Sequence, residues 1–380
     1  MINVKNKLFK KYFIKKSLHD LGVPHRLPNK NKYDIAIVIP CYNEFHFIFD
    51  TLESINTQKT QKLSTCLVII VINNFINDKH DIILNNKQTY DKLILQKYKF
   101  DFVAIDCFTS DNAFNNKNRG VGTARKVGMD FALQYFQNEM GVLCCLDADT
   151  IIDKNYLNVV YDHFCIKNFN ACTVNFKHQT SADEKLNEAI IKYEKILKET
   201  AYKIKQTGSP YGYVSLGSTI VCNAKSYISC GGMSSKQATE DFYFLQSLAK
   251  YTKIKSINEI LVFPSSRSEN RVYLGTGFRI NEYLQYNKFK NLNFNEESFV
   301  EIKNIISIVE KCYGLKFDNF LQKAKLSLNM ESYTFMIEKK IQNVWMKFHE
   351  NCSSKKQFMI FFHQWFDALM IIQLLKKLNN

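Results

Sequence analysis

Apolar residues form short, nearly continuous runs along the first part of the chain, and each run is followed by a polar or helical stretch. Runs of this kind, rich in β-branched residues, predict strands buried on both faces; they cover 34–40, 66–72, 101–107 and 142–146. Helical spacing follows the first run at 45–58 and precedes the fourth at 122–138. This alternation predicts an α/β fold with a mixed, mainly parallel sheet between helices.

Beyond residue 150 the alternation weakens. The pattern predicts helices at 151–168, 184–206 and 240–250, strands at 170–176 and 219–223, and a glycine-rich loop at 208–217. From about 290 the apolar residues keep helical spacing to the end. We therefore expect three regions: a basic helical lead-in at 1–33, an α/β domain at 34–290 and a C-terminal helical region at 291–380.

Composition supports a folded chain with a large core. The chain has 380 residues, of which 46% are hydrophobic, with 30 Phe and 20 Tyr. A net charge of +15 favours anionic partners such as nucleotides, but it is spread along the chain and no helix-turn-helix, RRM or zinc motif is present, so nucleic acid is not an expected partner. The dense basic stretch at 5–16 is interpreted as a solvated helix face, with peripheral membrane contact as the alternative.

The cysteines indicate a reducing compartment. There are 11, an odd number without a CxxC pair, and several lie inside apolar runs where cysteine acts as a small hydrophobic residue. The N-terminus lacks the apolar segment of a signal peptide, and the apolar stretch at 358–375 is interrupted by polar residues, as in a buried amphipathic helix. We expect a cytoplasmic protein, with attachment to the inner face of the membrane as the alternative.

Two aspartates follow the fourth apolar run. Asp147 and Asp149 are separated by one residue, so in extended chain their side chains share a face. Open α/β sheets bind ligands at the carboxyl ends of their strands, where two carboxylates suit a hard divalent cation holding a diphosphate. A plain turn after a strand is the alternative, because Asp is common in turns.

Two further motifs precede these acids in the chain. Pro40, Tyr42, Asn43 and Glu44 end the first strand, where Asn and Glu can hydrogen-bond a base or ribose. The segment 120–128 is rich in small residues and carries Arg125, which can pair with a phosphate or an aspartate. A strand end with a helix cap, and a helix start with packing glycines, are the structural alternatives.

Two motifs lie later in the chain. A glycine pair at 231–232 precedes Thr239, Glu240 and Asp241, which makes Asp241 a candidate general base for an acceptor hydroxyl; simple helix capping by Thr239 is the alternative. Arg267 and Arg271 lie four residues apart in a Ser- and Gly-rich loop. Two such arginines can clamp a departing diphosphate, although solvated surface arginines would also fit.

In this order and after these strands, the motifs resemble those of the family 2 glycosyltransferases with a GT-A fold, over roughly residues 34–280. The resemblance implies that Asp147 contacts the nucleotide ribose or sugar and that Asp149 ligates Mg²⁺ or Mn²⁺. It implies that Asp241 is the base of an inverting transfer, with Glu240 near the acceptor. Pro40, Tyr42, Glu44, Asn73, Arg125 and Arg271 would contribute to binding the nucleotide sugar.

The sequence also departs from that family. Asn73 and Asn74 stand where an aspartate commonly reads the nucleobase, so the preference between UDP and GDP stays open, and Lys126 follows Arg125 where the family often has Asn. The Gln-x-x-Arg-Trp motif of processive synthases is absent, which disfavours a processive polysaccharide synthase.

The predicted function is metal-dependent transfer of a sugar from a nucleotide sugar to a hydroxyl acceptor, as in glycan biosynthesis. A nucleotidyltransferase that makes a nucleotide sugar, and a non-catalytic GT-A-like binding protein, are the alternatives. The C-terminal helices are expected to cover the acceptor side, to pair two copies or to dock on a membrane.

Overall fold

The protein is described here by a computed structural model that covers residues 7–115, 120–235, 239–268 and 275–379. Within these residues one mixed sheet runs in the order β1-β4-β3-β2-β5-β8-β7-β9-β6. The strands are β1 (Val23–Pro24), β2 (Ile35–Cys41), β3 (Cys66–Asn73), β4 (Asp101–Cys107), β5 (Val142–Cys145), β6 (Ile151–Ile152), β7 (Ala171–Phe176), β8 (Ile220–Asn223) and β9 (Lys255–Phe263).

The centre of the sheet is parallel. Strands β4, β3, β2 and β5 pair in parallel, β7 pairs in parallel with β9, and β8 lies antiparallel between β5 and β7. Every residue of β2 and β3 is buried, so both faces of the sheet are covered. The expected α/β class, with a mainly parallel sheet between helices, is confirmed.

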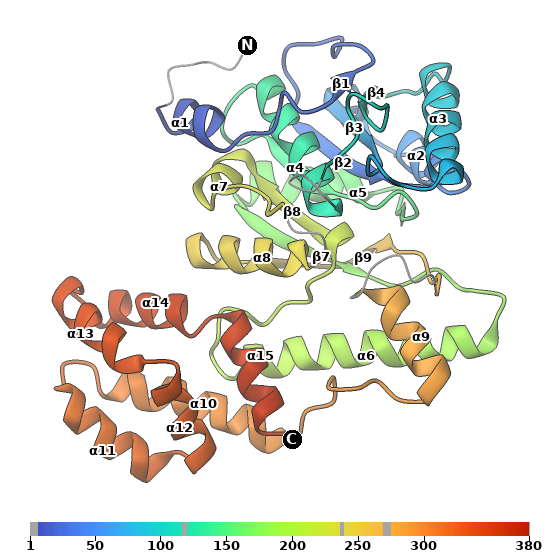
Figure 1. Ribbon diagram of the computed structural model, residues 1–380. Coiled ribbons are helices and arrows are strands. Elements are labelled where there is room, and N and C mark those ends of the chain that lie inside the picture. Colours follow the sequence, from blue (N-terminus) through green and yellow to red (C-terminus); the bar gives the residue numbers. More distant parts are fainter. Residues whose placement is uncertain (1–6, 116–119, 236–238, 269–274, 380) are drawn as a thin grey trace. The chain divides into compact units, whose positions relative to one another are not determined.

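Helices connect and cover these strands (Figure 1). They are α1 (Lys7–Lys15), α2 (Ile48–Asn56), α3 (His80–Ile94), α4 (Val121–Ala132), α5 (Tyr156–Tyr161), α6 (Glu184–Gln206), α7 (Ala224–Ser229) and α8 (Glu240–Tyr251). Helix α4 packs against β2 and β3 through Gly128, where an added Cβ would lie 2.4 Å from Val38 Cγ1. Glycine therefore lets this helix approach the sheet closely, which places Arg125 beside the strand ends.

The structure departs from the expected elements at 151–168 and at 255–263. The predicted helix at 151–168 begins instead with β6, which pairs with Val262 and Phe263 of β9, and only then continues as α5 and a π-helical turn, Asp162–Ile166. Strand β9 itself was not expected. Its exposed middle and the register shifts beside Asn175 interrupt the alternation that marks a strand in sequence.

The chain divides into two compact units. The first comprises 1–190 and 215–281, and the second comprises 191–214 and 282–380, so α6 and α9 (Thr276–Tyr286) each contribute to both. The second unit also contains α10 (Glu296–Lys311), α11 (Phe317–Ser327), α12 (Met330–Glu338), α13 (Ile341–Asn351), α14 (Lys355–Trp365) and α15 (Ala368–Lys377). The three regions expected from the sequence, with a boundary at 290, stay a prediction.

The second unit has an aromatic core. Trp345 is 1% exposed, stacks on Phe320 with ring centroids 4.1 Å apart, and lies against Phe358. Among the described residues no single helix has the length and hydropathy of a membrane span. Helices α14 and α15 meet those criteria only as a pair bent by 64°.

Candidate active site

The loop after β2 is fixed by asparagines of α3. Asn43 has a left-handed backbone (φ 58°), which asparagine tolerates better than most residues. Its N–H donates to Asn86 Oδ1 at 2.9 Å, and the N–H of Phe45 donates to Asn85 Oδ1 at 3.2 Å. These two bonds hold the predicted site residue Glu44, which is buried, between the strand end and α2.

The two aspartates after β5 are held through their backbone. Thr51 Oγ1 donates to the carbonyl of Ala148 at 2.9 Å, and Gln179 Nε2 donates to the carbonyl of Asp149 at 2.9 Å. The side chains of Asp147 and Asp149 are 33% and 18% exposed, respectively. Both carboxylates therefore remain accessible just after the carboxyl end of β5, while the backbone that carries them is fixed.

Arg125 joins the strand end to the start of α8. Its Nη2 donates to Asp147 Oδ1 at 2.5 Å and its Nε donates to Glu240 Oε1 at 3.3 Å, with the arginine 4% exposed. Burial alone would lower the pKa of Arg125, but Asp147 and Glu240 outweigh it and raise that pKa. Gly217 lies against this guanidinium, because a Cβ there would come within 2.3 Å of Nη2.

The candidate base lies in the first turn of α8. Burial raises the pKa of Glu240 to about 7 against the opposing effect of Arg125, and burial also raises the pKa of Asp241. Asp241 is less buried than Glu240, and its Oδ1 accepts from the N–H of Phe242 at 2.7 Å. An aspartate whose pKa is raised is a better proton acceptor than an ordinary one.

Helix capping by Thr239 does not account for this motif. Thr239 is the residue before α8, but its side chain makes no capping hydrogen bond and its backbone is left-handed (φ 62°). That conformation is a true outlier for a β-branched residue, and such strain concentrates at functional sites. Glu240 points at Arg125 and is buried, so its role beside an acceptor stays a prediction.

Arg267 lies between the two acidic motifs. Its Nη2 contacts Asp149 Oδ2 and lies 3.1 Å from both carboxylate oxygens of Glu44, and its Nε lies 3.1 Å from Asp149 Oδ2. The guanidinium carbon is 3.9 Å from the ring centre of Phe47. Burial alone would lower the pKa of Arg267, but Asp149 and Glu44 raise it, so this cation is firmly charged.

The donor set fits a hard divalent cation. Among the described residues no group of three or more His, Cys, Asp or Glu side chains is placed to hold a metal. Magnesium, however, is usually bound through one or two carboxylates together with substrate phosphates. Glu44 and Asp149 supply two carboxylates that already converge on one cationic atom. That Asp149 ligates Mn²⁺ or Mg²⁺ stays a prediction, and Glu44 lies beside it as a compatible second ligand.

The remaining predicted residues lie at or near the same strand ends. Pro40 is buried in β2, and Tyr42 follows that strand. Asn73 ends β3, and its buried Oδ1 accepts no hydrogen bond from the residues that the structure describes. Arg271 lies outside the described residues.

Sequence reasoning missed the residues that hold the site. Thr51, Asn85, Asn86 and Gln179 act by hydrogen-bonding backbone atoms of the motif loops. Polar residues inside helices or just after a strand carry no distinctive spacing. A single sequence therefore offered no signal for them.

Comparison with known proteins gives structural similarity alone. No family model and no curated protein matches the chain. Among solved structures, it resembles S. aureus TarS 1–349 in complex with UDP-GlcNAc (13% identity, 79% of this chain and 78% of that one, TM-score 0.44). It also resembles the mannosyltransferase PcManGT from Pyrobaculum calidifontis in complex with GDP-Man and Mn²⁺ (11% identity, 94% and 92%, TM-score 0.41). At these values the likenesses do not assign an activity to this chain.

Proposed function

We propose that the protein is a metal-dependent glycosyltransferase of the inverting type, which moves a sugar from a UDP- or GDP-sugar to a hydroxyl acceptor. One observation carries this proposal. Five acidic side chains and two arginines gather where β2 and β5 end and α8 begins. They are Glu44, Asp147, Asp149, Glu240 and Asp241, with Arg125 and Arg267. Carboxylates beside guanidinium groups suit two substrates: a polyanionic nucleotide sugar and an acceptor that carries the reacting hydroxyl.

The residues divide the chemistry among them. Asp241 takes the proton from the acceptor hydroxyl as that oxygen attacks the anomeric carbon, and one direct displacement needs only one base. A bound divalent cation would act as the Lewis acid for the departing diphosphate, with Asp149 as its ligand. Arg125 keeps Asp147 in place for the ribose or sugar, because it is itself held by Glu240. Asn73 supplies an acceptor that suits a nucleobase N–H.

Nucleotide binding and turnover test this proposal separately. Calorimetry with UDP and with GDP, each with Mn²⁺, should show binding that depends on the metal and is lost in Asp149→Ala. Asp111→Ala, at an exposed acid, is the control and should bind normally. Asp241→Asn should keep nucleotide binding and lose about 10²- to 10⁴-fold in sugar transfer. Absence of binding with every nucleotide tested would contradict the proposal.

The pH dependence of transfer gives a further check. Because the base must be ionised and the pKa of Asp241 is raised, activity should fall with acid at a pH above the ordinary aspartate value of about 3.9. Release of pyrophosphate from a nucleoside triphosphate and a sugar phosphate would instead favour a nucleotidyltransferase. Location in the cytoplasm, membrane contact and pairing through the C-terminal helices stay predictions, which fractionation, liposome flotation and solution mass would test.

A further inference from the structure

Three carboxylate oxygens converge on one nitrogen of Arg267. Both oxygens of Glu44 lie 3.1 Å from Nη2, and Asp149 Oδ2 contacts the same atom. This nitrogen carries two hydrogens, so it cannot give each of the three acceptors its own proton. Divalent cations, by contrast, take six or more oxygen ligands around one point. The carboxylates of Glu44 and Asp149 therefore converge on one point, as the ligands of a divalent cation do, and a guanidinium nitrogen occupies that point.

The backbone that carries the two carboxylates is positioned without help from Arg267. The loop that carries Glu44 is held by Asn85 and Asn86, and the carbonyl of Asp149 is held by Gln179. These bonds involve backbone atoms and do not depend on the charge between the two acids. Withdrawal of the guanidinium would consequently leave the backbone of Glu44 and Asp149 in place after β2 and β5.

Arg267 has a second support that does not need the acids. Its guanidinium carbon lies 3.9 Å from the ring centre of Phe47, and such cation–π contacts favour arginine. The residue follows β9 in a segment without regular structure, and its side chain is 16% exposed. A short rotation of the side chain can therefore free the carboxylates while the guanidinium keeps apolar contact.

We propose that Glu44 and Asp149 form a divalent-cation site in which Arg267 is the resident counter-ion, and that Arg267 leaves this point when the cation binds. The part played by a nucleotide rests on the proposed function: the diphosphate gives the released guanidinium a new anionic partner. Cation alone must displace Arg267, whereas cation with nucleotide re-pairs it. The divalent cation and the nucleotide therefore bind cooperatively. Without nucleotide, Arg267 competes with free cations for the two carboxylates.

Manganese binding to the nucleotide-free protein tests this directly. Electron paramagnetic resonance counts free Mn²⁺ and gives its dissociation constant without any activity. Arg267→Gln should bind Mn²⁺ at least about tenfold more tightly than the wild type, because a competing positive charge is removed. Arg267→Met is a second variant that keeps the packing on Phe47, and it should show the same gain.

Matched variants separate this cause from others. Arg267→Lys keeps the charge and should bind Mn²⁺ as weakly as the wild type. Arg26→Gln removes an arginine that pairs with Asp101 at 3.0 Å, away from the site, and should also leave the affinity unchanged. Adding Glu44→Gln to Arg267→Gln should abolish the gain. Equal affinities in the wild type, Arg267→Gln and Arg267→Met would overturn the proposal, and a gain that survives Glu44→Gln would remove Glu44 from the site.

A nucleotide arm distinguishes the two proposals. UDP or GDP should raise the Mn²⁺ affinity more in the wild type than in Arg267→Gln, because the variant has no guanidinium to re-pair. If neither nucleotide nor any other nucleoside diphosphate binds to any of these proteins, the proposed function fails. The Mn²⁺ comparison in nucleotide-free protein stands or falls independently of that result.

Discussion

Arg125 lies in the interior with its guanidinium shared between Asp147 and Glu240. Removing Arg125 leaves the buried carboxyl group of Glu240 without its cationic partner, whereas Asp147 keeps partial contact with water. Arg125→Met should therefore lower the free energy of unfolding by about 3–5 kcal/mol, even though methionine fills much of the same volume. Urea unfolding followed by circular dichroism measures this loss.

An exposed pair provides the control for Arg125. Lys225 lies 2.9 Å from Glu139, and both side chains are well exposed to solvent. Lys225→Met should cost less than about 1 kcal/mol, because surface pairs gain little over hydrated ions. If both variants lost the same small amount, the Arg125 cluster would contribute no more than a surface contact.

Glu240 makes stability depend on pH. Burial raises its pKa in the folded protein from the ordinary 4.5 to about 7. Between these values the folded state binds the proton and the unfolded state does not. The contribution of protonated Glu240 to the free energy of unfolding is therefore complete below pH 4.5 and is lost as pH rises through about 7. Glu240→Gln cannot titrate. The wild type should therefore exceed this variant in free energy of unfolding by more at about pH 5 than at about pH 8.

Subtracting the free energy of unfolding of Glu240→Gln from that of the wild type removes the effect of all other titrating groups. Urea unfolding at the two pH values supplies both differences. A difference that grows with pH would mean that Arg125 lowers the pKa of Glu240 more than burial raises it. A difference independent of pH would mean that Glu240 keeps its ordinary pKa in the folded protein.

At the scale of elements, the sequence predicted the helices and strands that have clear hydrophobic periodicity and clear terminating residues. The strand at 101–107 and the helix at 184–206 agree with β4 and α6 to the residue, because a short, mainly apolar run and a long amphipathic stretch are distinctive patterns. Strand β9 was missed and the start of 151–168 was predicted wrongly, because β6 exists only through its pairing with β9. The motifs indicated where the acids lie. They could not show that Arg267 joins Glu44 to Asp149 over more than a hundred residues of chain.

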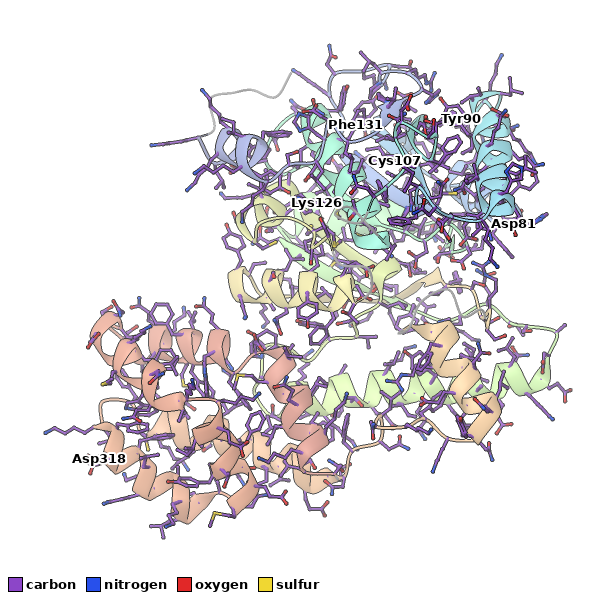
Figure 2. All side chains as sticks on the ribbon, in the orientation of Figure 1. Asp81, Tyr90, Cys107, Lys126, Phe131 and Asp318 are labelled. Carbon is purple, nitrogen blue, oxygen red and sulfur yellow. The ribbon has the colours of Figure 1, made fainter. Side chains whose placement is uncertain are left out.

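Helix α1 is fastened to the α/β unit through a buried carboxylate. Asp130 of α4 accepts from the Tyr12 hydroxyl at 2.7 Å and from the Tyr227 hydroxyl at 2.8 Å. Lys126, which is labelled in Figure 2, lies 3.0 Å from Asp130 and also donates to Tyr12 at 2.7 Å. Burial, and then Asp130, raise the pKa of Tyr12, so its phenol stays protonated and keeps donating. The network joins α1, α4 and α7.

Loss of one hydroxyl should loosen the N-terminal helix. Tyr12→Phe leaves Asp130 one donor short and Lys126 without its phenol, which should cost about 1–3 kcal/mol. Hydrogen exchange of 7–15 should accelerate more than exchange in β2 or β3. Tyr251→Phe, at a residue that is 47% exposed, is the control and should change neither quantity. Unchanged protection of 7–15 in Tyr12→Phe would show that the Tyr12 hydroxyl does not hold the helix, and would leave apolar packing and the Leu18 N–H bond to Asp130 as its supports.

At the scale of the whole molecule, the candidate site and the tryptophans belong to different units. All the site residues discussed above lie within 1–190 and 215–281, and both tryptophans of the chain, Trp345 and Trp365, lie in 282–380. Tryptophan fluorescence therefore reports on the second unit, whereas nucleotide binding reports on the first. The full chain thus carries an independent probe for each unit.

Trp345→Ala should separate the two units in one experiment. It removes a side chain that is 1% exposed and stacked on Phe320, which should cost the second unit about 3–5 kcal/mol. The remaining Trp365 should then show a lower unfolding midpoint in urea. Because no site residue is touched, the dissociation constant for nucleoside diphosphate with Mn²⁺ should stay at the wild-type value below that midpoint. Weaker nucleotide binding in the folded variant would instead mean that the helical unit takes part in holding the donor.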